Sequence, residues 1–162
     1  MREWSKRPEE VRNLMNPAFC GRIILATVVE YQEKTNRAFP FPLVYLILPL
    51  VLPRQIREKI NSRTKLTNWV QNNQELIYNF AKRTSDLIEI TNEALEFMMQ
   101  AGYLSITDSG EIEKTVTVGS ISKTKNSDIE VKECITKAEH VARWFATAGA
   151  VEIIYFCLGV RP

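Results

Sequence analysis

The stretch LEFMMQAGYLSITDSGEIEKTVTV, residues 95–118, decides the fold that the sequence predicts. It begins with the end of an apolar helical pattern, which Gly102 is expected to terminate in a left-handed conformation. Residues 103–107 and 111–118 then alternate between apolar and polar side chains, and Asp108-Ser109-Gly110 between them is a turn sequence. A helix that runs directly into a β-hairpin is typical of a winged helix. We therefore predict a mainly α, winged-helix-like domain with one small hairpin.

The residues before this hairpin predict a helical core over 16–101. Asn16-Pro17 is a helix start, because the Asn side chain accepts a free backbone N–H and proline at the first helical position loses no hydrogen bond. This helix is expected over 17–33 and closed by Asn36. Residues 74–100, capped by Asn73, keep a helical apolar period without Pro or Gly and predict the longest helix of the chain.

An apolar run of sixteen residues, 38–53, lies between these two helices and has no charged or amide side chain. It is shorter than the ~18–20 residues of a membrane helix and contains four prolines, so we predict a buried core segment. Short helices are expected over 43–48, with a kink or stop at Pro49, and over 54–60. A further helix through Leu66, Trp69 and Val70 is expected to be capped by Ser62 or Thr64.

The C-terminal part predicts two more helices after a polar loop. Residues 119–128 are rich in Ser, Lys, Thr and Asn, and from Val131 a helical pattern returns. Gly149 interrupts that pattern, and an apolar helix over 151–158 follows, ended by Gly159. We predict one domain over 1–162, made of the helical core 16–101, the hairpin 103–118 and C-terminal helices within 131–158.

Charge and cysteine content exclude several classes of protein. The 21 Lys and Arg against 19 Asp and Glu give a net charge of +2, so a nucleic-acid partner would have to be bound by a local basic patch. Three distant cysteines, Cys20, Cys134 and Cys157, lie among apolar residues and predict buried reduced thiols. Residues 1–12 lack an apolar signal segment, so we expect a cytoplasmic protein without a membrane span.

No constellation for catalysis or for a cofactor is evident. The single histidine, His140, has no metal-ligand spacing around it, and the glycines form no phosphate-binding loop. Glu89, Glu93 and Glu96 share one helix face, which suits a metal but is more often a solvated face. We therefore expect neither enzymatic activity nor a metal or cofactor.

Basic residues form one local cluster that suits nucleic acid. If the helix before the hairpin is a recognition helix, these side chains are placed to contact phosphates, although basic stretches are usually solvated surface. The candidate nucleic-acid contacts are Arg54, Arg57, Lys59, Arg63, Lys65, Lys82 and Arg83. The alternative function that they support is a free-standing winged-helix regulator that binds double-stranded DNA.

Four stretches carry a resemblance to a known family. They are Asn16-Pro17-Ala18-Phe19-Cys20, the apolar run 41–52, Ala142-Arg143-Trp144-Phe145, and Ile154-Tyr155 with Leu158-Gly159-Val160-Arg161-Pro162. In these the sequence resembles the middle component of bacterial three-component ABC systems. The resemblance implies a non-enzymatic adaptor between an SMC/Rad50-like ABC ATPase and an effector component, in defence against phage or other invading DNA.

An adaptor requires residues that contact its partners. Our candidate partner contacts are Pro49, Trp69, Trp144, Tyr155 and Arg161. Helical spacing of the aromatic residues also fits core packing, which is the more common role, whereas Arg161 follows the last predicted helix and is free to dock on a partner. A homodimer is compatible with a winged helix of this kind but is not specified by the sequence.

Overall fold

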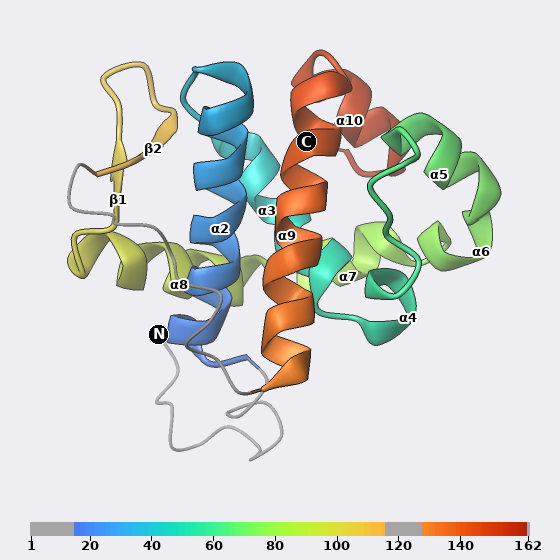
Figure 1. The fold of residues 1–162 in the computed structure, drawn as a ribbon, viewed down its shortest axis with the longest axis horizontal. Helices are drawn as coiled ribbons and strands as arrows, with labels where there is room; N and C mark the ends of the chain where they lie inside the picture. The colour runs from blue at the N-terminus through green and yellow to red at the C-terminus, as the bar shows by residue number, and fades with distance from the viewer. Residues whose placement is uncertain (1–14, 116–127, 162) are drawn as a thin grey trace.

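The computed structural model describes residues 15–115 and 128–161 and is mostly helical. The N-terminal helices are α2 (Pro17–Thr35), the 3-10 turn η2 (Phe41–Leu43), α3 (Val44–Val51), α4 (Arg54–Arg57) and α5 (Leu66–Asn72). They are followed by α6 (Gln74–Ile77), α7 (Phe80–Asp86), α8 (Ile88–Gln100), strands β1 (Leu104–Ile106) and β2 (Ile112–Lys114), α9 (Ile129–Thr147) and α10 (Val151–Cys157). Figure 1 shows how they are arranged.

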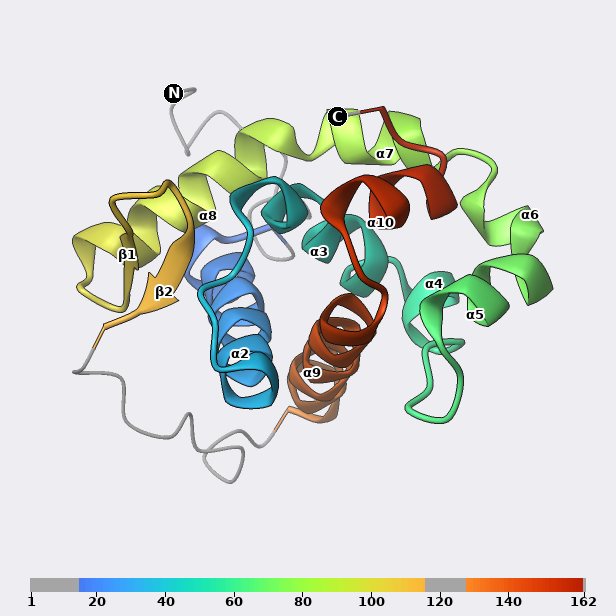
Figure 2. The ribbon, with the colours of Figure 1, turned by 90° about the horizontal axis from the view of Figure 1, so that it is seen from above.

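Helices α2 and α9 form the centre of the molecule. They lie side by side with their first turns at the same end (Figures 1 and 2). The Thr27 hydroxyl of α2 lies 3.4 Å from the carbonyl oxygen of Ala138 on α9, and Arg143 Nε donates to Glu30 at 2.9 Å. The predicted start of α2 is confirmed, because Asn16 Oδ1 accepts from the Ala18 N–H at 2.7 Å, and so is its left-handed end at Asn36.

Helix α8 packs across α2 on the side away from α9 (Figure 2). The close approach depends on Gly21, because a Cβ atom added there would lie 2.6 Å from Met98 Cε. Real Cβ atoms do not come so near to a neighbour. A glycine in the first turns of α2 therefore lets α8 lie against it.

The single helix predicted over 74–100 is wrong, since the chain breaks there at Asn79 and again at Leu87. A straight helix of that length would be about 40 Å long, more than the diameter of a small domain, so much of its apolar stripe would have nothing to pack against. Three shorter helices instead follow the curved surface of the core. Helix α7 can then pack against α3, with Phe80 buried, and α8 can pack against α2, with Ala94 buried.

Of the predicted caps in this region, Asn73 occupies the N-cap position, at the start of α6, but makes no capping hydrogen bond to it. Helix α5 begins after Lys65, and neither Ser62 nor Thr64 caps it. Asn73 donates its side-chain amide to the Trp69 carbonyl at 2.8 Å, so it bonds back to the end of α5 and provides no side-chain cap for α6.

The apolar run 38–53 is core, as predicted. Leu46, Ile47, Leu48, Leu50 and Val51 are fully buried. A stop at Pro49 is not observed, since α3 continues through it to Val51. Pro49 is near the end of a short helix, so its missing N–H deprives only one carbonyl of a partner. Within the described residues, no helix is both long and apolar enough to cross a membrane.

The predicted β-hairpin is present where it was expected, but its strands are short. Ser105 pairs with Glu113 in antiparallel register, and Gly102 and Gly110 have the positive φ angles that end the helix and form the turn. Phe39 pairs with Ile112 on the other edge of β2, which joins the hairpin to the segment after α2. Strand β2 ends at Lys114, and the predicted residues 116–118 lie outside the described part. The winged-helix detail of the prediction is not confirmed by this arrangement.

The C-terminal helices agree with the prediction. Helix α9 begins at Ile129, two residues before the predicted Val131, because Asp128 Oδ1 accepts from the Glu130 N–H at 2.9 Å. Gly149 separates α9 from α10 with a φ of 94°. Buried apolar residues from α2, α3, α5, α8, α9 and α10 form one core cluster. The predicted loop 119–128 lies outside the described residues, apart from Asp128.

Candidate partner-binding groove

Three of the predicted partner contacts belong to the core, which corrects the sequence-based assignment. Trp69 and Trp144 are buried with ring centroids 5.1 Å apart. Their indole N–H groups donate to the carbonyls of Lys59 and Thr64, each at 2.8 Å, so both polar groups are satisfied inside the fold. Pro49 is buried within α3. These side chains hold α3, α5 and α9 in place and are not available to a partner.

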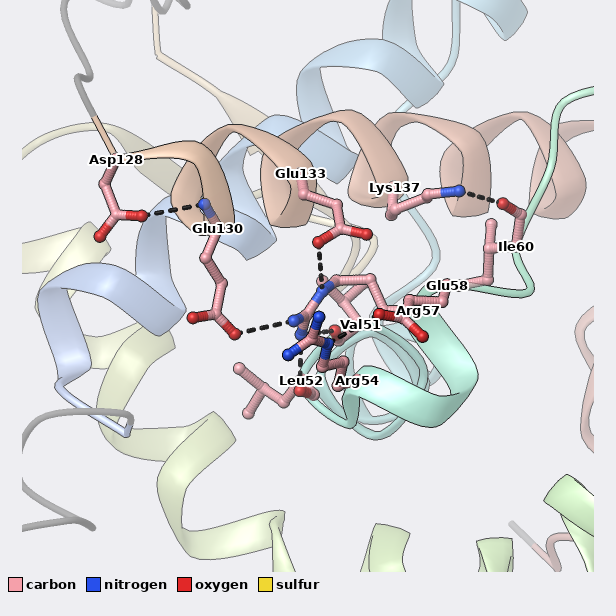
Figure 3. Close-up of polar contacts among 10 residues, drawn as sticks. All are labelled: Val51, Leu52, Arg54, Arg57, Glu58, Ile60, Asp128, Glu130, Glu133 and Lys137. Carbon is pink, nitrogen blue, oxygen red and sulfur yellow. Dashed lines mark hydrogen bonds and ion pairs between the residues drawn. The ribbon is translucent and has the colours of Figure 1, made fainter.

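Arg57, predicted to contact nucleic acid, is also buried, with its side chain only 3% exposed. Its guanidinium donates to the carbonyls of Val51 at 3.0 Å and Leu52 at 2.7 Å (Figure 3). It also pairs with Glu130 at 2.8 Å and Glu133 at 3.5 Å, both on α9. Arg57 therefore joins the α3–α4 turn to α9 and does not reach a phosphate, which is a correction to the predicted basic patch.

The other predicted nucleic-acid contacts are divided among several places. Arg54 forms an exposed ion pair with Glu58 at 2.7 Å (Figure 3), which raises the pKa of Arg54 and lowers that of Glu58. Lys82 pairs with Asp86 at 2.8 Å on α7, where Arg83 is half-buried. Three of the predicted contacts, Lys59, Arg63 and Lys65, remain exposed between α4 and the start of α5.

Helix α7 lies near α10 and the chain end (Figure 2). A groove is formed there by residues of α7, the start of α8, α10 and the chain end. Its volume is about 530 Å³, and it is lined by Tyr45, Ala81, Thr84, Ser85, Ile88, Tyr155, Gly159, Val160 and Arg161. The predicted partner contacts Tyr155, in α10, and Arg161, in the segment after it, both line this groove. Tyr155 is fixed in the wall, because its hydroxyl donates to the Pro42 carbonyl. Arg161 is exposed.

Exposed apolar side chains occur in this groove and on α10, the helix that contributes Tyr155 to its wall. Ile88 lines it and is exposed, while Phe156 and Ile153 lie one turn apart on the outer side of α10. Phe156 is 86% exposed. Sequence reasoning did not select Phe156, because it lies in a helix that reads as apolar all round. We call this surface, formed by the groove with Ile153 and Phe156, the C-terminal groove.

Burial limits the reactivity of the two buried cysteines, Cys20 and Cys134. Burial, with Cys134 nearby as a smaller effect, raises the pKa of Cys20 to about 12, and burial raises the pKa of Cys134 to about 11. Both are thus protonated at neutral pH and are poor nucleophiles. Within the described residues, no three His, Cys, Asp or Glu side chains are grouped to hold a metal ion. Glu93 is buried between the exposed Glu89 and Glu96, so these three do not form one solvated face.

Comparison with models of protein families gives one match over almost the whole chain. The model describes the ABC-three component (ABC-3C) system Middle Component 3, and it matches residues 4–162. The chain belongs to this family. The resemblance noted in the sequence is therefore confirmed, and the Middle Component 3 protein has partner components by the definition of its system. No curated protein and no solved structure matches it.

Proposed function

We propose that this Middle Component 3 protein is a non-enzymatic adaptor in the cytoplasm. In this role it bridges an SMC/Rad50-like ABC ATPase and an effector component, in defence against phage or other foreign DNA. The family supports the adaptor role, because a middle component works with two others. The two buried thiols are protonated and are poor nucleophiles, which fits a protein that acts by binding.

The C-terminal groove is the observation that carries this proposal. An aromatic side chain that stays exposed on a helix lining a groove can serve as a binding anchor, and burying a Phe fully is worth about 2 kcal/mol. Phe156 and Ile153 provide such anchors, and Arg161 supplies a cation at the chain end. A partner that presents an apolar side chain beside a carboxylate would complement both features. We assign the groove to one of the two partner components.

The test is co-expression of the protein with the other two components encoded with it, followed by affinity purification. Phe156→Asp is expected to reduce recovery of one component about tenfold or more, because it places a charge in the contact. Ile129→Asp is the matched control, since Ile129 is 83% exposed at the start of α9, outside the groove. Absence of any complex with the unmodified protein would refute the adaptor function. Equal recovery with both variants would refute the location.

The DNA-binding regulator remains the alternative function, with a smaller basic surface than the sequence predicted. Lys59 and Arg63 are exposed between α4 and α5, so the double variant Lys59→Gln with Arg63→Gln would weaken duplex binding and reduce its salt dependence. The test is a gel-shift titration of duplex DNA at two salt concentrations. Failure of the unmodified protein to shift DNA at low salt would rule this alternative out.

A further inference from the structure

A cavity of about 600 Å³ lies on another part of the protein, where four segments meet. These segments are the start of α2, the α3–α4 link, the junction of α7 with α8, and the start of α9. Its walls are largely apolar, with Phe19, Leu52, Leu87 and Val131 among them. A hollow of this size with apolar walls and a few polar groups is the usual form of a small-molecule site.

The electrostatics of this cavity favour a negative group. Helices α2 and α9, of 19 residues each, both begin at it, since Asn16 and Asp128 line its wall and precede their first turns. Figure 1 shows these two first turns at the same end of the molecule. The N-terminal end of a helix carries about half a positive charge. At α9 the carboxylates of Asp128 and Glu130 offset this charge, so it is the end of α2 that adds to the charges of the arginines in the wall.

Arg83 has an unpaired hydrogen-bond donor in this region. It lines the cavity, and its Nη1 atom is buried without a hydrogen-bond acceptor. Buried polar groups in native proteins are nearly always paired, so a donor left in this state points to an acceptor that is supplied from outside. Arg57 lines the same cavity, and its buried Nε also has no hydrogen bond, only the longer ion pair to Glu133 at 3.5 Å.

The carboxylates in the wall are already engaged. Asp86 pairs with Lys82, Asp128 caps α9, and Glu130 pairs with Arg57. Within the described part of the chain, no ion pair joins any of them to Arg83. Arg83 is thus the cation in this wall that is placed to bind an incoming oxyanion.

We propose that this cavity binds a small amphipathic organic anion, with its carboxylate or phosphate head on Arg83 and its apolar body against Phe19, Leu52 and Val131. An oxyanion supplies the acceptor that Nη1 lacks, and a guanidinium binds both head groups well. Contact with the apolar body of the ligand buries the apolar side chains of the cavity wall, which favours binding. The ligand holds together four segments from distant parts of the chain, so its binding stabilises their arrangement.

The test uses the full-length protein alone, so its outcome is independent of the partner complex. Isothermal titration calorimetry would compare decanoate and decyl phosphate with uncharged decanol. We expect one anion per chain and binding of decanol at least about tenfold weaker, because decanol lacks the charge-assisted bond. Arg83→Gln is expected to weaken anion binding about tenfold and leave decanol unchanged. Arg37→Gln, at an exposed arginine outside the cavity, is the matched control.

A second variant tests the cavity itself. Val131 is half-buried in its wall, and Val131→Trp would fill the space and abolish binding of both anions, with circular dichroism to verify the fold. Whichever anion binds more tightly identifies the preferred head group. Equal affinities for decanoate and decanol, an unchanged affinity in the Arg83 variant, or no saturable binding to the unmodified protein would overturn the proposal.

Discussion

Replacing Arg57 by Ala should destabilise the protein far more than replacing the nearby Arg54. Arg57→Ala removes two hydrogen bonds from a charged donor, at 3.0 Å and 2.7 Å, and leaves the carbonyls of Val51 and Leu52 without this donor. Each such bond is worth about 1.5–3 kcal/mol. Glu130 is 59% exposed, so its loss of a partner strands no buried anion and adds little. We expect a loss of about 3 kcal/mol.

The measurement is urea unfolding monitored by circular dichroism, which gives the free energy of unfolding from the midpoint and slope. For a chain of this size, about 3 kcal/mol corresponds to a fall of roughly 6–12 °C in Tm. Arg54→Ala is the matched control, because its ion pair with Glu58 is exposed and is expected to contribute less than about 1 kcal/mol. If the two variants unfolded within about 1 kcal/mol of each other, the structural role assigned to Arg57 would be refuted.

Three further predictions follow from particular contacts. Gly21→Ala should cost about 1–3 kcal/mol, because its Cβ would lie 2.7 Å from Met98 Cγ and 3.1 Å from the Ala94 carbonyl oxygen, and neither contact is relieved by moving the end of the Met98 side chain alone. Thermal unfolding measures this cost, and an unchanged Tm would contradict the close packing of α2 with α8. The free energy of unfolding should fall as pH rises above about 9, because the unfolded chain loses its thiol protons there while the folded pKa values of Cys20 and Cys134 are about 12 and 11. Urea midpoints measured from pH 8 to 11 test this. The double variant Cys20→Ala with Cys134→Ala should show a smaller fall in midpoint with pH. Tyr155→Phe should cost about 1 kcal/mol through loss of its bond to the Pro42 carbonyl, whereas Tyr103→Phe, at an exposed position, serves as the control in the same unfolding assay.

The elements with strong local signals could be predicted from the sequence. Asn16-Pro17 marks the start of α2, and Gly149 and Gly159 mark the ends of the last two helices, because caps and left-handed turns depend on a few neighbouring residues. The buried run 38–53 was also evident from composition alone. The caps and turns are decided within about one turn of the chain, and the buried run by the composition of its own sixteen residues.

The breaks in the predicted long helix and the burial of Arg57 have no such local signal. No Pro or Gly marks Asn79 or Leu87, and the break follows from the size of the core. Arg57 lies 73 residues from Glu130, so its partner is known only after the fold is known. The C-terminal groove was partly anticipated through Tyr155 and Arg161, whereas Phe156 could be recognised only when its exposure was known.

The pairing of α2 with α9 has a consequence for synthesis on the ribosome. Thr27 contacts Ala138 across 111 positions of the chain, and Glu30 contacts Arg143 across 113. Such distant contacts delay folding, since the intervening loop must first be closed. A nascent chain cannot complete its core until α9 has left the exit tunnel, and the apolar segment 38–53 stays only partly covered until then, because α9 is one of the helices that pack on α3. Production of this protein should therefore depend on chaperones that shield that segment during translation.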